Sequence, residues 1–217
     1  MKIGVLIPYR NDRPRFLEHL KLMLETQTVQ PNEVLYVDYK PESDAVDITQ
    51  RYRRGYATLS ERGCTVIFFM EVDDYYSPEY IDTMLKLWAA YGYLNLFGTN
   101  YTYYYHLKLR AYFRMDHKFR ASAMNTLIRP NLKIDWGLDK NPYTDLQLWR
   151  LIKGKSVTPS KIISIGIKHG VGMCGGIAHT DRFNRYKHKD TDLSFLRENM
   201  TPESFTFYST YFDGEQR

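Results

Sequence analysis

Residues 64–74 read Cys-Thr-Val-Ile-Phe-Phe-Met-Glu-Val-Asp-Asp, an apolar run that ends abruptly in three acids. An apolar run without polar alternation predicts a strand buried on both faces of a sheet. Crowding Glu71, Asp73 and Asp74 directly after it is unfavourable unless a cation lies among them. Their oxygen atoms suit Mg²⁺ or Mn²⁺ better than zinc. The stretch therefore predicts a divalent-ion site at a strand end. The alternative is a solvated acidic turn whose Asp74 favours the start of the next helix.

Strand and helix patterns alternate through the first half of the chain. Residues 2–8 and 33–39 predict two further strands. Helices are expected from Pro14 to before Pro31, from Ile48 to Gly63, and from the pair Ser77-Pro78 to about Gly92. Because the links are short, this alternation predicts an α/β fold of one domain, with a mostly parallel, Rossmann-like sheet and helices on both faces.

The second half is less regular. We expect one or two strands within residues 94–105, further strands at 121–128 and 162–167, a helix from Asn141-Pro142 to Gly154, and a tail beyond Gly176 laid over the body. The segment Tyr101–Tyr105 holds four of the 19 tyrosines. It predicts either aromatic pairs across neighbouring strands or a surface that stacks on sugars or bases.

The composition is that of a folded protein in a reducing compartment. The 217 residues are 43% hydrophobic and 25% charged. Cys64 and Cys174 form neither a disulfide framework nor a metal-ligand pattern, and no apolar run approaches the roughly 20 residues that span a bilayer. Disulfide-rich secreted, membrane-spanning and collagen-like classes are excluded, and a cytoplasmic location is expected. The net charge of +5 is compatible with a polyanionic partner and equally with a small anionic substrate.

Polar segments follow each of the three predicted parallel strands, at residues 8–12, 38–40 and 71–74. Ligands of such sheets bind outside the carboxyl ends of the strands, so these segments should lie at one edge. Five of the 13 glycines fall within residues 166–176, around Lys168 and His169. Because glycines have no side chain, a phosphate can approach the backbone of this segment closely. The alternative interpretation is a flexible surface loop.

Three segments together resemble the nucleotide-sugar-dependent glycosyltransferases of GT-A fold and family-2 type. Residues 5–11 (VLIPYRN), followed by residues 24–28 and 31–34, are similar to their first strand and helix. Residues 69–81 (FMEVDDYYSPEYI) look like their D-x-D metal motif, and residues 166–179 resemble the glycine-rich element of small bacterial and phage members. The resemblance covers residues 2–179. It implies a single domain over 1–217, with a nucleotide-binding half (about 1–92), an acceptor and catalytic half (about 93–179) and a tail (about 180–217).

The resemblance also implies roles for individual residues. Glu71, Asp73 and His179 would hold a Mn²⁺ or Mg²⁺ ion, and Asp145 would be the catalytic base, although an acid at a helix start has the same sequence appearance. Residues expected to bind the nucleoside-diphosphate sugar are Pro8, Tyr9, Arg10, Asp38, Tyr39, Asp73 and Lys168. Residues expected to contact the acceptor are Tyr75, Arg110, Arg114 and Trp136.

The sequence departs from the family pattern at several positions. Tyr39 stands where the family often has a second acid that reads uracil, so its ring could stack on another base. Thr144 replaces the glutamate that precedes the base. Only one helix fits between the second and third strands, which removes the family's Arg-Asn element. Candidates to replace that element are Arg51, Arg53 and Arg54.

The predicted activity is inverting transfer of a sugar from a nucleoside diphosphate to an acceptor hydroxyl. A divalent ion would neutralise the leaving diphosphate, and a carboxylate would take the acceptor proton. A hydroxymethylated base of phage DNA, in a host cytoplasm, fits the basic residues Lys108, Arg110, Arg114, Lys118, Arg120 and Arg129. Polysaccharide, lipid-linked or protein acceptors are alternatives. Other hypotheses are an inactive module that binds carbohydrate or nucleic acid, and a nucleotidyltransferase.

Overall fold

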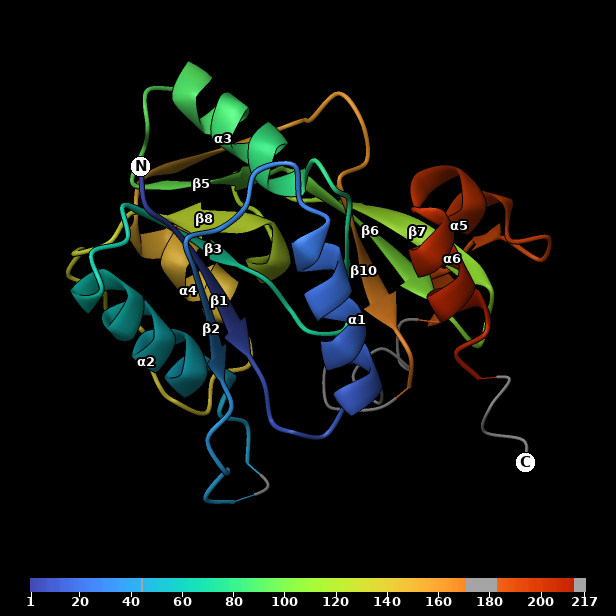
Figure 1. Ribbon diagram of the computed structural model, residues 1–217, viewed down its shortest axis with the longest axis horizontal. Coiled ribbons are helices and arrows are strands. Elements are labelled where there is room, and N and C mark those ends of the chain that lie inside the picture. The colour runs from blue at the N-terminus through green and yellow to red at the C-terminus, as the bar shows by residue number, and fades with distance from the viewer. Residues whose placement is uncertain (44, 171–182, 213–217) are drawn as a thin grey trace.

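A computed structural model describes residues 1–43, 45–170 and 183–212 of the chain (Figure 1). Its larger sheet has six strands in the order β2-β1-β3-β8-β5-β9. β1 pairs in parallel with both β2 and β3, and β8 is the one member that runs antiparallel to its neighbours. The strands are β1 (Ile3–Pro8), β2 (Glu33–Val37), β3 (Val66–Phe69), β5 (Leu96–Thr99), β8 (Thr126–Ile128) and β9 (Gly154–Val157).

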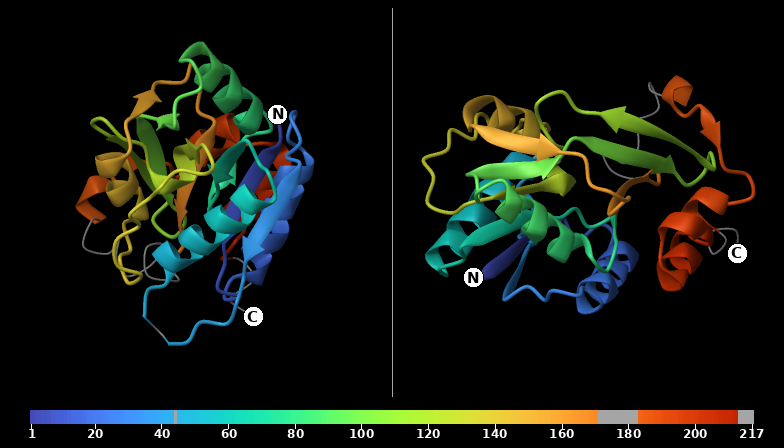
Figure 2. Two further views of the ribbon diagram at one scale, coloured as in Figure 1. Left: turned by 90° about the vertical axis from the view of Figure 1, so that its left-hand side faces the viewer. Right: turned by 90° about the horizontal axis from the view of Figure 1, so that it is seen from above.

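Four helices cover the two faces of this sheet (Figures 1 and 2). They are α1 (Pro14–Glu25), α2 (Ile48–Glu61), α3 (Tyr80–Ala90) and α4 (Thr144–Leu151). Alternate side chains of β3 enter opposite cores, as the pleat of a strand requires. Phe68 packs in a cluster with side chains of α1 and α3, whereas Phe69 packs in a cluster with side chains of α2 and α4. The predicted α/β architecture, with a mostly parallel sheet between helices, is confirmed.

A second sheet lies beside the first, in the strand order β11-β7-β6-β10-β4. It consists of β4 (Tyr75–Tyr76), β6 (Tyr101–His106), β7 (Ala111–Asp116), β10 (Ser164–Lys168) and β11 (His188–Lys189). The tyrosine segment is β6, which pairs antiparallel with β7. Tyr104 faces Phe113 with ring centroids 5.5 Å apart, so these tyrosines form the predicted cross-strand aromatic pairs.

Two predicted helix starts are shifted. The α3 helix begins at Tyr80 rather than at the pair Ser77-Pro78, because the amide of Ser77 instead donates to the carbonyl oxygen of Ile163 over 2.9 Å. The α4 helix begins at Thr144, since the side chain of Asn141 accepts the amide of Tyr143 in a turn ahead of it. The first shift continues the pairing of β4 with β10 by one residue, and the second is local competition between a side-chain turn and the helix.

The tail contains two short helices, α5 (Ser194–Asn199) and α6 (Pro202–Ser209). The Thr201 hydroxyl caps α6 by accepting the amide of Ser204, and proline at the next position favours the helix start. Residues on α6 and just after it pack on α1: Phe207 stacks on His19 at 4.1 Å and Tyr211 stacks on Phe16 at 4.5 Å. No helix in the described part of the chain is long and apolar enough to cross a membrane.

Two buried histidines predict how stability depends on pH. Burial lowers the pKa of His19 from 6.5 to about 4, and burial likewise lowers the pKa of His117 from 6.5 to about 4. Because the unfolded chain binds these protons at higher pH than the folded chain, their stabilisation is complete above pH 6.5 and is lost progressively as the pH falls to 4. We expect the urea concentration at the unfolding midpoint to fall as the pH is lowered from 6.5 to 4, and to fall less in His19→Gln. A midpoint that is flat across the window contradicts the assignment of both as neutral buried groups.

Candidate active site

Three carboxylates gather where β3 ends. Glu71, Asp73 and Asp74 each offer an oxygen atom, and these atoms all lie within 4.8 Å of one another. Asp73 and Asp74 are buried, whereas Glu71 is partly exposed. The chain folds this way because β3 is central in the sheet, with β1 and β8 on its two sides, so its carboxyl end opens at the middle of the edge.

Asp73 is held as a charged carboxylate. Its Oδ2 accepts from Nη1 of Arg13 over 2.7 Å and bonds Nε2 of His169 over 2.8 Å. Burial alone would raise the pKa of this carboxyl, but Arg13 and then His169 outweigh it and hold the pKa well below its ordinary value. The backbone amide of Ile167 fixes the neighbouring Asp74 by donating to its Oδ1 over 2.7 Å.

The other carboxylate oxygens have few donors. Oδ2 of Asp74 is buried and has no hydrogen-bond partner among the described residues, and Glu71 Oε1 accepts from the Tyr52 hydroxyl over 3.3 Å. Burial, together with the neighbouring acids, raises the pKa of Glu71 and of Asp74. A buried carboxylate oxygen without a donor, beside two further carboxylates, matches the ligands that Mg²⁺ and Mn²⁺ prefer. These residues therefore fit a divalent cation.

Lys168 ends β10 and lies buried beside the three acids. Burial lowers the pKa of its ammonium, but Asp74, Asp73 and Glu71 outweigh that effect and raise it. The side chain lines two adjoining cavities, as does Glu71. Any anion that enters either cavity therefore meets this ammonium.

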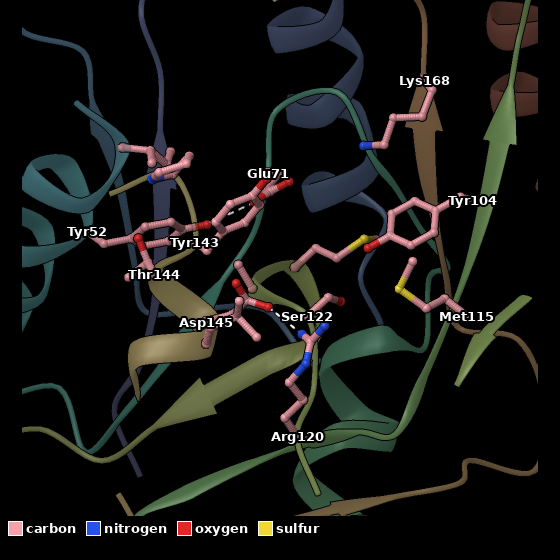
Figure 3. A pocket seen from close by; sticks show the side chains of 15 residues that line it. Tyr52, Glu71, Tyr104, Met115, Arg120, Ser122, Tyr143, Thr144, Asp145 and Lys168 are labelled. Carbon is pink, nitrogen blue, oxygen red and sulfur yellow. Dashed lines mark hydrogen bonds and ion pairs between the residues drawn. The ribbon is translucent and has the colours of Figure 1, made fainter. Parts of the chain in front are cut away.

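The larger cavity has a volume of about 420 Å³. Asp145, in the first turn of α4, lines it opposite Lys168, with Glu71 between them (Figure 3). Asp145 Oδ2 accepts from Nη1 of Arg120 over 2.5 Å. Burial raises the pKa of Asp145, although the Arg120 guanidinium counteracts it. The cavity thus holds an acid with elevated proton affinity, an ammonium and the edge of the acidic cluster.

The smaller cavity, of about 190 Å³, receives four of the residues predicted to bind the donor. These residues are Pro8, Arg10, Asp73 and Lys168. The side chain of Tyr9 instead belongs to the core, and that of Asp38 is exposed. The Tyr39 hydroxyl donates to Gln50 over 2.5 Å, and the ring centroid lies 4.1 Å and 4.3 Å from the guanidinium carbons of Arg51 and Arg54.

The residues predicted to contact an acceptor lie elsewhere and line neither of these two cavities. Tyr75 is buried, and its hydroxyl accepts from the amide of Thr201 over 3.2 Å. Trp136 is buried against Tyr56, with ring centroids 5.4 Å apart. Arg110 is exposed in the β6–β7 turn, and Arg114 pairs with Asp116 over 2.7 Å. The predicted metal ligand His179, the residue Cys174 and the glycines at 172, 175 and 176 lie outside the described residues.

Arg13 was not predicted as a site residue, and Arg120 was predicted only as one of the basic residues that fit a DNA acceptor, because their partners are remote in sequence. Arg13 meets Asp73 across 60 positions, and Arg120 meets Asp145 across 25. The only sequence signal for Arg13 is its place in the loop after the first strand. Loops at the carboxyl ends of parallel strands are where ligands of such sheets bind. Arg51, a candidate to replace the Arg-Asn element, is buried, and it donates to the carbonyl oxygens of Val37 and Tyr39 over 2.6 and 2.9 Å.

Comparison with known proteins supports the fold and leaves the family open. No family model matches the chain, and no curated protein matches it. The chain is similar to the crystal structure of S. aureus TarS 1–349 in complex with UDP, with a TM-score of 0.52, 14% identity, and coverage of 77% of this chain and 60% of that chain. It is also similar to A197 from STIV, with a TM-score of 0.45, 14% identity, and coverage of 73% and 82%. The chain spans less than two thirds of the TarS structure, and this likeness shows a shared α/β fold.

Proposed function

We propose that this chain is a divalent-cation-dependent, inverting glycosyltransferase that moves a sugar from a nucleoside diphosphate to an acceptor hydroxyl. One observation carries the proposal: the acidic cluster, Lys168 and Asp145 border adjoining cavities at the carboxyl edge of the sheet. The fold is shared with TarS, whose crystal structure is a complex with UDP. The two halves of a sugar transfer, neutralising a leaving diphosphate and accepting a proton, need these residue types.

In this proposal the smaller cavity takes the diphosphate. Glu71, Asp73 and Asp74 would hold the Mn²⁺ or Mg²⁺ ion, which would neutralise charge that develops on the leaving diphosphate. The buried ammonium of Lys168 supplies a second, fixed positive charge on the wall that the two cavities share. A low-dielectric wall makes that charge more effective than the same charge in water.

Asp145 is the proposed base, and the larger cavity is the proposed site of the sugar and the acceptor hydroxyl. A carboxylate accepts a proton better when its pKa is raised toward the working pH, and burial raises the pKa of Asp145. Arg120 orients this carboxylate through the bond to Oδ2, and backbone amides at the start of α4 also bond to the carboxylate. Arg120 is therefore a positioning residue.

Release of nucleoside diphosphate from a panel of UDP-, GDP-, ADP- and dTDP-sugars tests the activity without knowledge of the acceptor, because water can take its place. We expect release from donors of one base, dependent on added Mn²⁺ or Mg²⁺ and lost in Asp73→Asn. Binding of a donor without release, at saturating protein, would favour an inactive carbohydrate- or nucleotide-binding module. Release that is unaffected by Asp73→Asn contradicts the proposed site.

DNA is one acceptor class that remains a proposal, and the basic residues bear on it. Lys108 and Arg110 lie in the β6–β7 turn, whereas Arg114 and Arg120 already pair with Asp116 and Asp145. If duplex DNA is the acceptor, binding should weaken with salt by a log–log slope of about −0.9 for each neutralised phosphate. Fluorescence anisotropy of labelled duplex across a salt series measures this slope. Absence of binding at low salt removes DNA in favour of a polysaccharide, lipid-linked or protein acceptor.

A further inference from the structure

The guanidinium of Arg13, the residue just before α1, lies against the acidic cluster. Nη1 donates to Oδ2 of Asp73 over 2.7 Å, and Nε donates to Oδ1 of Asp12 over 3.1 Å. The side chain is 18% exposed and lines the smaller cavity together with Asp73 and Lys168. Arg13 therefore touches both a proposed cation ligand and the space where an anion would lie.

The Asp73 oxygen that Arg13 occupies is already shared with His169. A divalent cation that used this oxygen would come against the guanidinium, and two positive groups at contact distance repel each other strongly in a buried site. If Arg13 moved away, His169 would still bond Asp73, so the carboxylate would keep one partner. Arg13 can thus leave Asp73 without depriving this carboxylate of its last hydrogen-bond partner.

We infer that Arg13 is a diphosphate-binding residue that occupies the carboxylate of Asp73 until the diphosphate arrives. This inference rests on the proposed function. A planar guanidinium binds phosphate oxygens in pairs, so a diphosphate in the smaller cavity offers Arg13 better partners than one carboxylate oxygen. Its transfer to the diphosphate frees Oδ2 of Asp73 for the cation. Cation and diphosphate then bind cooperatively, because each favours the arrangement that the other needs.

A single variant, Arg13→Gln, should change the affinities for Mn²⁺ and for pyrophosphate in opposite directions. Binding of Mn²⁺ alone, followed through the electron paramagnetic resonance signal of the free ion, should tighten by about tenfold, since a competing charge is gone. Binding of inorganic pyrophosphate in the presence of a chelator, measured by calorimetry, should weaken by about tenfold or more, since a guanidinium partner is gone. The control Lys21→Gln removes the same charge from the exposed face of α1 and should change neither affinity.

The conservative variant and the unfolding transition separate a binding role from a folding role. Arg13→Lys keeps the charge, so it should retain much of the pyrophosphate affinity while binding Mn²⁺ as weakly as the wild type. Suppose that the wild type binds both Mn²⁺ and pyrophosphate. If Arg13→Gln lowers both affinities, or changes neither, the role of Arg13 is overturned while the proposed function stands. Weakening of both probes with a lowered unfolding temperature would assign Arg13 to the framework of the site. If the wild type binds neither probe, the proposed function fails and this inference fails with it.

Discussion

The Asp145→Asn variant should release nucleoside diphosphate about 10²–10⁴-fold more slowly than the wild type in single-turnover experiments, while donor affinity stays unchanged. The amide keeps the size of the side chain and can still lie beside Arg120, but it cannot accept a proton. Because the pKa of Asp145 is raised by burial, the wild-type rate should also fall on acidification at a pH above the ordinary range of an aspartate. Asp145→Asn should remove this acid limb from the pH profile.

A matched control separates catalysis from helix stability. Asp82 lies in the first turn of α3 and pairs with Lys86 over 2.6 Å, as Asp145 lies in the first turn of α4 and pairs with Arg120. Asp82 lines neither of the two cavities. Asp82→Asn should therefore leave the rate at the wild-type value. An unchanged rate in Asp145→Asn would make Asp145 a helix-start acid and assign proton transfer to another group.

The Arg51→Met variant should lose about 3–5 kcal/mol of unfolding free energy. Arg51 is fully buried, and its guanidinium donates to the carbonyl oxygens of Tyr9 and Val37 and to the carboxylate of Asp47. It thereby ties the ends of β1 and β2 to α2. Methionine fills the space of the hydrocarbon stem but removes the guanidinium donors from the Tyr9 carbonyl oxygen and from Asp47, whereas the Val37 carbonyl oxygen keeps the amide of Tyr9. A polar group that loses its partner in such a site costs more than the hydrogen bond itself contributes.

Urea unfolding measures this loss, with Arg54→Met as the control on the exposed face of the same helix. Both arginines contact the ring of Tyr39, so the difference between the variants isolates the buried hydrogen bonds. If Arg51→Met does not fold, Arg51→Lys keeps one charge-assisted donor and should lose less. Equal unfolding free energies for Arg51→Met and Arg54→Met contradict the structural role.

The first half of the fold follows from local patterns, whereas parts of the second half do not. The strands β1 and β3 are buried on both faces and therefore appear as apolar runs, and β2, at the edge of the sheet and only partly buried, keeps a largely apolar sequence as well. β7, by contrast, contains Arg114 beside its aromatic residues and therefore does not appear as an apolar run. In the turn before it, Arg110 has a φ of 42°, a backbone conformation that usually requires glycine, so the sequence gives no sign of the turn. The short tail helices depend on packing more than on their own length: α6 packs against α1, and Phe195 of α5 packs against tyrosines of β6 and β7.

The same distinction applies to the site. Glu71, Asp73 and Asp74 were predictable because they are adjacent in sequence and follow a buried strand. The bond between His169 and Asp73 spans 96 positions, and Tyr75 and Trp136 proved to be buried packing residues, which their residue types do not reveal. Proximity across the fold is set by the order of strands in the sheets, and no local pattern encodes that order.

Calorimetric titration of nucleoside diphosphates into the wild-type chain, with Mn²⁺ or with a chelator, shows whether the cation and the diphosphate bind together. We expect one nucleoside diphosphate to bind at least about tenfold more tightly with Mn²⁺, and Asp73→Asn to abolish this difference because the amide is a poorer cation ligand than the carboxylate. Equal affinity with Mn²⁺ and with the chelator, or a difference that survives in Asp73→Asn, would contradict a cation and a nucleoside diphosphate sharing this site.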